Sequence, residues 1–315
     1  MKIVILDKST LGDDIDLTPI YNQGECTEYP TTAQEMVCER VKDAQVIVTN
    51  KIKLNAETLK GADNLRLICV AATGYDNIDT AYLKEKGVAL CNVPGYSTDS
   101  VAQVTVSMAL SLVTHLNEYR DFVHSGEYSK SGVANKLSPV YHEVSSMTWG
   151  VLGGGAIGTA VAKVAQALGC RVLVCRRKQE GEFPLADIDT LCRESDILSI
   201  HLPLSQETRG ILSRERIESM KKTAVVVNTA RGAVTDEKAL ADAIREERIG
   251  ALGVDVYSVE PFTKEHPFYD ILGYDNVCLT PHMGWGSAEA RARCVRMMAE
   301  NISRFFAGET HNRIV

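Results

Sequence analysis

The sequence predicts an α/β protein built from two Rossmann-like domains with parallel sheets. Short apolar runs alternate with helical stretches twice along the chain, and a glycine-rich turn opens the second series. The length of 315 residues also exceeds the usual size of a single hydrophobic core. We therefore expect two domains, each with its own sheet.

The first series of predicted strands occupies the N-terminal third of the chain. Its apolar runs lie at residues 3–7, 46–50, 67–70 and 88–92, and helical stretches such as residues 32–42 and 56–61 separate them. Apolar runs of this length that alternate with helices are typical of βα units in a parallel sheet.

The second series begins near residue 148. Its runs of Val, Ile and Leu lie at residues 171–175, 197–201, 224–228, 250–254 and 277–280, which predicts strands buried on both faces. A helical pattern over residues 99–115 joins the two series, and another covers residues 288–306. We expect this last helix to return to the first domain. One domain then comprises residues 1–98 and 285–315, and the other comprises residues 99–284.

Glycines spaced G-x-G-x-x-G mark the start of the second series. They are Gly153, Gly155 and Gly158, between an apolar run that ends at Leu152 and helix-forming residues 160–168. A dinucleotide-binding turn needs this strand-turn-helix context. We expect Gly153 to allow the tight turn, Gly155 to let the backbone approach a pyrophosphate, and Gly158 to let the helix pack on the strand.

Composition excludes several classes of protein. A net charge of -7 argues against a nucleic-acid surface. The nine cysteines are odd in number and never spaced C-x-x-C, so we expect reduced thiols in a cytoplasmic protein rather than disulfides. No His, Cys and acid spacing predicts a metal site. No segment reaches the ~18 apolar residues of a membrane span, so we expect no membrane partner.

Three polar residues lie beyond predicted strands of the second series: Arg231, Glu260 and His282. Open α/β sheets bind ligands at this edge. A guanidinium grips a carboxylate through two hydrogen bonds, and a histidine paired with a carboxylate is favoured in its charged, acidic form. The set suits the reduction of a 2-oxo acid, which needs a cation for the carboxylate and an acid for the carbonyl oxygen. Taken singly, each residue also has an ordinary interpretation, as a surface cation, a solvated acid or a loop histidine.

Seven motifs, in order, resemble the D-isomer-specific 2-hydroxyacid dehydrogenases. They are residues 72–79 (ATGYDNID), 92–97 (NVPGYS), the glycine turn, 201–204 (HLPL), 228–232 (NTARG), 253–261 (GVDVYSVEP) and 280–282 (TPH). Residues 91–103 and Trp285 are most similar to the glycerate dehydrogenase, or hydroxypyruvate reductase, branch. The resemblance implies reversible reduction of hydroxypyruvate or glyoxylate to D-glycerate or glycolate. It also implies a homodimer, with the active site in the cleft between a substrate-binding first domain and a dinucleotide-binding second domain.

The resemblance assigns roles residue by residue. Catalysis falls to Arg231, Glu260 and His282. The cofactor-binding residues that it implies are Thr105, Gly153, Gly155, Ala156, Ile157, Gly158, His201, Pro203, Thr208, Thr229, Ala230 and Asp255, with Pro203 at the adenine and Asp255 at the nicotinamide carboxamide. The substrate-binding residues are Thr73, Gly74, Arg231, His282 and Trp285.

Some interpretations stay open. His201 is also consistent with a purely structural histidine, and Trp285 either walls the pocket or packs between domains. The histidines without a partner pattern are His115, His124, His142, His266 and His311. Oxidation of another small anion such as phosphite, or a corepressor-like protein that senses dinucleotides, remains an alternative function on the same fold.

The end of the second predicted strand of this series bears on the choice of cofactor. NAD-type sites commonly carry an acidic residue there, ~20 residues past the glycines, to bind the ribose 2′-hydroxyl. Here Cys175 is followed by Arg176, Arg177 and Lys178. Guanidinium groups at this position suit a 2′-phosphate. We therefore expect Arg176 and Arg177 to bind the cofactor, and NADP(H) to be favoured over NAD(H).

Overall fold

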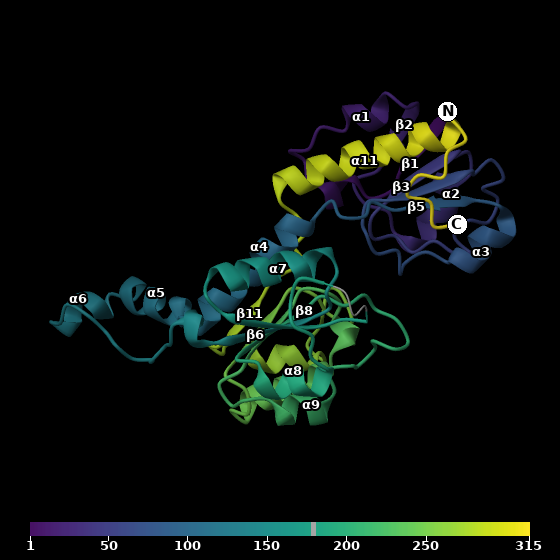
Figure 1. The fold of residues 1–315 in the computed structure, drawn as a ribbon. Coiled ribbons are helices and arrows are strands. Elements are labelled where there is room, and N and C mark those ends of the chain that lie inside the picture. Colours follow the sequence, from purple (N-terminus) through teal and green to yellow (C-terminus); the bar gives the residue numbers. More distant parts are fainter. Residues whose placement is uncertain (178–180) are drawn as a thin grey trace. The chain divides into compact units, whose positions relative to one another are not determined.

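The computed structural model describes residues 1–177 and 181–315. They form two compact units, one of Met1–Ser97 with Trp285–Val315 and one of Thr98–Gly284. Each unit contains a parallel sheet with helices packed on it (Figure 1). The predicted α/β class with two parallel sheets is confirmed.

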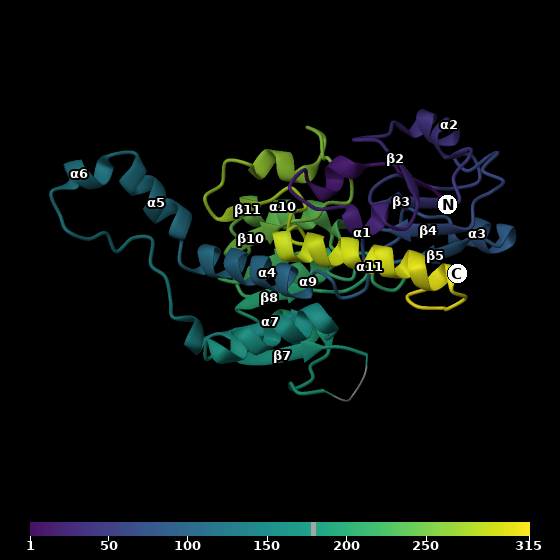
Figure 2. The same cartoon turned by 90° about the horizontal axis from the view of Figure 1, so that it is seen from above.

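The first unit is built on a five-stranded sheet in the order β2-β1-β3-β4-β5. Its strands are β1 (Lys2–Ile5), β2 (Glu25–Glu28), β3 (Val46–Thr49), β4 (Leu67–Val70) and β5 (Ala89–Cys91). Its α-helices are α1 (Thr18–Tyr21), α2 (Val37–Val41), α3 (Thr80–Lys86) and α11 (Ala288–Phe306). The C-terminal helix α11 packs against β4 and α1, so distant parts of the chain share one core (Figure 2).

Two expectations for this unit were wrong. Residues 56–61 form a turn rather than a helix, because the side chain of Asn55 accepts the backbone N–H groups of Glu57 and Thr58 and the chain turns at Gly61 with φ of +79°. The strand β2 was also missed. Its sequence, ECTE, is polar and largely exposed at the edge of the sheet, so it carries no apolar signal.

The second unit is built on a six-stranded sheet in the order β11-β10-β9-β8-β6-β7. Its strands are β6 (Thr148–Leu152), β7 (Arg171–Cys175), β8 (Ile197–Ile200), β9 (Val225–Asn228), β10 (Ala251–Val254) and β11 (Val277–Leu279). Its α-helices are α4 (Thr98–Val113), α5 (Leu116–His124), α6 (Glu127–Ser131), α7 (Ala156–Ala167), α8 (Ile188–Glu194), α9 (Arg214–Ser219) and α10 (Glu237–Arg245).

Alternate residues of these strands enter two separate hydrophobic clusters. Val225 and Val227 of β9 pack with α4 and α7, whereas Val226 packs with α8, α9 and α10. This burial on both faces explains the unbroken apolar runs in the sequence. The strand order reverses between β6 and β8, which is where sheets of this kind open to bind ligands.

Helices α5 and α6 and the chain that follows them extend away from the rest of the second unit (Figure 2). Large apolar side chains are exposed along this segment, namely Leu116, Val123, Tyr128, Val133, Leu137, Val140 and Tyr141. Within the described ranges, no helix is both long and apolar enough to cross a lipid bilayer.

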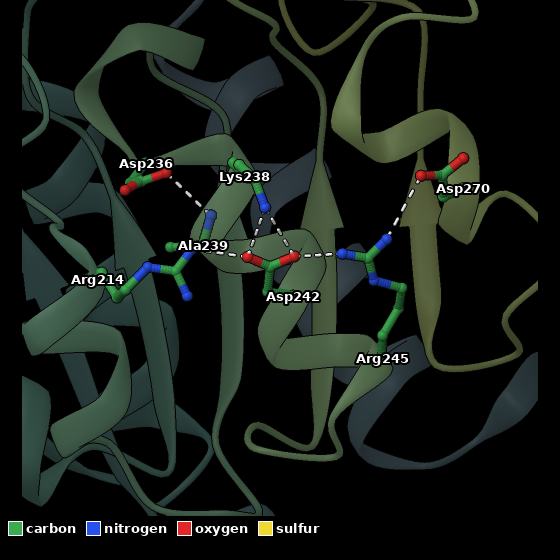
Figure 3. Close-up of polar contacts among 7 residues, drawn as sticks. All are labelled: Arg214, Asp236, Lys238, Ala239, Asp242, Arg245 and Asp270. Carbon is green, nitrogen blue, oxygen red and sulfur yellow. Dashed lines mark hydrogen bonds and ion pairs between the residues drawn. The ribbon is translucent and has the colours of Figure 1, made fainter.

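An ion-pair cluster on α10 ties this helix to its neighbours (Figure 3). The carboxylate of Asp242 accepts Arg214 at 2.6 Å and Lys238 at 3.0 Å and also pairs with Arg245, which reaches Asp270 at 3.4 Å. The hydrogen bond from Arg214, followed by that from Lys238, holds the pKa of Asp242 well below its usual range. The cluster therefore favours the folded state wherever Asp242 is ionised.

Replacing this carboxylate tests the cluster. Asp242→Asn should lower the urea midpoint of unfolding at pH 7, since three cations lose their shared anion. A carboxyl with a depressed folded pKa contributes stability above its unfolded value of about 3.8 and loses it as the pH falls further. The difference in urea midpoint between wild type and Asp242→Asn should therefore stay constant from pH 7 to pH 5 and become smaller at pH 3. A gap that widens in acid would contradict this account.

Candidate active site

The glycine turn lies between β6 and the N-terminus of α7. Gly153 has φ of +112°, and a Cβ there would lie 2.7 Å from the carbonyl carbon of His201. A Cβ on Gly158 would lie 1.9 Å from the carbonyl oxygen of Gly153, so the helix packs directly on the turn. A Cβ on Gly155 would meet no atom within 4 Å. The turn thus keeps open space at the helix N-terminus, where Ala156 and Ile157 follow, and this space fits a pyrophosphate.

His201 follows β8 beside this turn. Both of its ring nitrogens are buried and have no hydrogen-bond partner among residues 1–177 and 181–315. Burial lowers the pKa of the imidazole to about 3, so the ring is neutral near pH 7. Buried polar atoms are nearly always bonded, and an orphaned pair next to a dinucleotide turn fits a site that a ligand completes.

Arg176 lies immediately after β7 and beside the glycine turn. A Cβ on Gly154 would meet its Cδ at 2.8 Å, and a Cβ on Gly181 would meet its guanidinium at 2.5 Å. One guanidinium nitrogen donates to the carbonyl of Phe183 at 3.2 Å. The charged group of Arg176 is therefore held between the glycine turn and the loop after it. Its neighbour Arg177 is largely exposed and pairs with Glu207, and Lys178 lies outside the described residues.

Several other predicted cofactor residues bond within the protein. The hydroxyl of Thr208 donates to the carbonyl of Pro203 at 2.6 Å and closes that loop. Thr105 is completely buried, and its hydroxyl bonds that of Thr229 at 2.8 Å. Ala230 donates its N–H to Asn228 at 3.0 Å. Cofactor contacts by these residues stay predictions.

Glu260 and His282 form a close pair. The Nδ1 of His282 lies 2.6 Å from Oε2 of Glu260, and the other carboxylate oxygen accepts the backbone N–H of Tyr257 at 3.0 Å. Both side chains remain partly exposed, His282 at 25% and Glu260 at 30%. His282 adopts a left-handed φ of 52°, which is uncommon for a residue other than glycine and occurs preferentially at functional sites. This contact holds the imidazole ring against the carboxylate beyond the end of the sheet.

Arg231 stands at the same edge of the sheet, beyond β9. Its loop is held by Asn228, whose side chain donates to the carbonyl of Arg231 at 3.0 Å. One guanidinium nitrogen of Arg231 donates to the carbonyl of Ala230 at 2.7 Å, which turns the side chain back along its own loop. The three predicted catalytic residues therefore all lie in the second unit, beyond β9, β10 and β11.

Asp255 fixes the loop that carries His282. Its Oδ1 accepts the N–H of Met283 at 2.8 Å and the hydroxyl of Thr280 at 2.6 Å, and its Oδ2 accepts the N–H of Gly284 at 2.8 Å. Asp255 is only 2% exposed. This positioning role was not foreseen from the sequence, and the expected carboxamide contact stays a prediction.

The remaining predicted substrate residues belong to the first unit. Thr73, beyond β4, donates its hydroxyl to the carbonyl of Val93 at 3.0 Å, which orders the loop at Gly74. Trp285 packs on Tyr96 with ring centroids 6.3 Å apart and joins the core of that unit. Their substrate contacts stay predictions.

Two histidines expected to lack a partner do have one. His266 contacts Glu237 at 3.1 Å, and His115 contacts Glu118 at 2.7 Å. The second pair is spaced i, i+3 and was visible in the sequence. The first spans 29 positions, and only the fold brings it together. No group of His, Cys, Asp and Glu suited to a metal ion occurs among residues 1–177 and 181–315.

The glycine turn and the histidine-carboxylate pair place this chain among the Rossmann-fold oxidoreductases. A family model described as D-isomer specific 2-hydroxyacid dehydrogenase, NAD binding domain, matches residues 106–284. The chain therefore belongs to the D-isomer-specific 2-hydroxyacid dehydrogenase family, and its cofactor is a nicotinamide dinucleotide.

Individual relatives agree with this membership. The chain is 33% identical over 321 residues to a hydroxypyruvate reductase of Blautia hydrogenotrophica, which covers 99% of both chains. It is 33% identical over 313 residues to a glycerate dehydrogenase of Methylorubrum extorquens, covering 99% of this chain and 98% of the relative. Among solved structures, an acyclic imino acid reductase in complex with NADPH and D-Arg is similar with a TM-score of 0.87 and 27% identity, and the match covers 100% of each chain.

Proposed function

We propose that this chain reduces hydroxypyruvate, glyoxylate or a similarly short 2-oxo acid to the D-2-hydroxy acid, reversibly. The observation that carries the proposal is the 2.6 Å pairing of His282 with Glu260 at the edge of the sheet that also presents Arg231. The relatives named hydroxypyruvate reductase and glycerate dehydrogenase support this choice of substrates.

The chemistry follows from the residue types. The dinucleotide, when bound, supplies a hydride to the carbonyl carbon. His282 donates a proton from Nε2 to the carbonyl oxygen, and Glu260 stabilises the imidazolium that must exist beforehand. Arg231 binds the substrate carboxylate through its planar guanidinium. In the oxidative direction the same histidine accepts the hydroxyl proton.

Histidine replacement tests this assignment. His282→Ala should lower kcat by about 10²-fold to 10⁴-fold and leave the Kd of the cofactor nearly unchanged, because it removes a proton donor and no nucleotide contact. The measurement is steady-state reduction of a panel of 2-oxo acids. His311→Ala is the matched control, because it removes an imidazole from the first unit, and it should keep wild-type rates.

Arg231→Ala should mainly raise KM for the 2-oxo acid, and Arg231→Lys should restore it only in part, because an ammonium lacks the planar fork.

The panel also includes phosphite and an imino acid formed from a 2-oxo acid and an amine. Turnover of His282→Ala within a few-fold of wild type would refute the role of this histidine. Preferential turnover of phosphite or of the imino acid would overturn the proposed substrate class and leave the family membership intact.

We also infer that NADP(H) is favoured over NAD(H). Arg176 supports this inference, because its guanidinium donates to the carbonyl of Phe183, its side chain lies against the glycine turn, and the residue that follows the strand is an arginine rather than an acid. A 2′-phosphate there would form charge-assisted hydrogen bonds that a ribose hydroxyl cannot match. NADH should still bind, since its pyrophosphate and nicotinamide contacts are unaffected.

Reversal of this charge tests the inference. Arg176→Asp should lower kcat/KM for NADPH and improve or preserve that for NADH, at fixed ionic strength. Arg171→Asp is the matched control, because Arg171 begins the same strand and Arg176 follows its other end. It should leave the ratio of kcat/KM for NADPH to that for NADH unchanged. A wild-type preference for NADH, or an unchanged ratio in Arg176→Asp, would show that Arg176 does not select the cofactor.

We propose that the chain forms a homodimer through the segment that contains α5 and α6. This segment exposes several large apolar side chains, including Leu137 at 79% and Val140 at 69%. Exposed apolar residues that gather in this way mark interaction surfaces. The resemblance of the chain to its family, which implies a homodimer, supports a second copy of the chain as the partner.

Light scattering after size exclusion measures the assembly. Wild type should have twice the chain mass of 34.5 kDa, and Leu137→Lys combined with Val140→Lys should shift it toward the monomer, because buried ammonium groups are costly to desolvate. A monomeric wild type would contradict the proposal.

A further inference from the structure

A second Glu-His pair lies beneath the catalytic one. Glu237 is the first residue of α10 and His266 precedes the 3₁₀ turn Pro267–Ile271, and both are less than a tenth exposed. The Nδ1 of His266 accepts the backbone N–H of Phe268 at 3.2 Å, so the proton of the neutral ring resides on Nε2. That nitrogen donates to Glu237 at 3.1 Å. The tautomer is therefore fixed with its N–H toward the carboxylate.

Glu237 also holds a backbone segment. Its Oε1 accepts the N–H of Ser258 at 2.8 Å, and its Oε2 accepts the hydroxyl of the same residue. Gly232 also approaches this peptide closely, because a Cβ there would lie 2.2 Å from the nitrogen of Ser258 and 2.6 Å from Oε1 of Glu237. The peptide between Tyr257 and Ser258 is thus bonded to Glu237 and packed against the loop that carries Arg231.

The segment that contains this peptide is bonded to Glu260 and to the loop of His282. The N–H of Tyr257 donates to Glu260 at 3.0 Å. The hydroxyl of Tyr257 donates to the carbonyl of Thr280 at 2.8 Å, and that carbonyl also accepts the N–H of His282 at 3.0 Å. The Tyr257 ring packs edge-on against His266 with centroids 5.9 Å apart. One residue therefore connects the buried pair to Glu260 and to the loop of His282.

We propose that Glu237, held by His266, is a positioning residue that keeps Glu260 within hydrogen-bonding distance of His282 by fixing the Tyr257–Ser258 peptide. This inference rests on the proposed function, because it assumes that the Glu260-His282 pair supplies the proton for 2-oxo acid reduction. Glu237 bonds Ser258 and His266. It acts through the backbone, and catalysis is sensitive to small displacements of its groups.

The informative replacement is Glu237→Gln, which preserves size. Gln keeps an oxygen for the N–H of Ser258, but its amide group then faces the N–H of His266, and two donors cannot bond each other. His266 cannot reverse its tautomer without losing the bond from Phe268. The peptide should therefore shift, and Glu260 should lose contact with His282.

The experiment follows the His282 ring by NMR in the full-length chain, with its signal assigned by comparison with His282→Asn. The carboxylates that bear on this ring are Glu260, which bonds it, and Asp255, which bonds the backbone of its loop. In Glu237→Gln the pH at which His282 loses its proton should fall by about half a unit or more, because the imidazolium loses part of its stabilising partner. The control Asp242→Asn, on the same helix and away from this path, should titrate as wild type does.

Kinetics supply a second readout. Glu237→Gln should lower kcat for 2-oxo acid reduction between about tenfold and about a hundredfold, with KM and the Kd of the cofactor within about twofold of wild type. An unshifted His282 titration in Glu237→Gln, or an equal loss in Asp242→Asn, would overturn the positioning role. If wild type reduces no 2-oxo acid, the proposed function fails, and the NMR comparison still decides whether Glu237 holds the pair.

A second pair of variants covers the case in which Glu237→Gln does not fold. His266→Gln retains an N–H close to the position of Nε2 and should keep His282 titrating near the wild-type pH. His266→Leu removes that donor and should reproduce the fall. If the two variants behave alike while both are folded by circular dichroism, His266 has no part in positioning.

Discussion

The shared register of three parallel strands is the constraint on which the site depends. Asn228 of β9 lies opposite Val254 of β10, and Val254 lies opposite Leu279 of β11. Because the three strands run in the same direction and in this register, their C-terminal ends lie side by side at the same edge of the sheet. Each of these strand ends is followed within a few residues by a predicted catalytic residue: Arg231, Glu260 or His282. Residues that are up to about fifty positions apart in the sequence therefore lie at one edge of the sheet without long loops.

Acidic side chains take over where the ladder of the sheet ends. A loop beyond a strand has backbone N–H groups without a neighbouring strand, and these groups need acceptors. Asp255 supplies two of them for Met283 and Gly284, and Glu260 and Glu237 serve Tyr257 and Ser258. The first unit uses the same device, since Asp7 beyond β1 accepts the N–H groups of Asn50 and Lys51. In both units, carboxylates therefore stabilise the loops that follow the strands by accepting their backbone N–H groups.

The sequence allowed prediction of whatever depends on local pattern. The strand β7 and the helix α11 agree with the predicted ranges to the residue. Their signals, a continuous apolar run and a helical period, depend only on residues within the element itself. The predicted catalytic residues do occupy one sheet edge, because each follows a strand of that pattern.

What escaped prediction depends on partners far away in the chain. The polar edge strand β2 exists because β1 pairs with it, and no property of ECTE reveals this. His266 looked isolated because its carboxylate is 29 positions away on α10. Asp255 was expected to bind the cofactor, and its hydrogen bonds to Met283 and Gly284 exist only once the loops beyond β10 and β11 are adjacent.

The orphaned ring of His201 has a thermodynamic consequence. Its nitrogens leave water when the protein folds, which costs about 1–3 kcal/mol for each unsatisfied group, and a ligand that arrives later does not incur this cost again. A neutral imidazole offers one donor and one acceptor, so two hydrogen bonds are forgone at this ring. The folded chain therefore bears the desolvation of this ring in advance of any ligand.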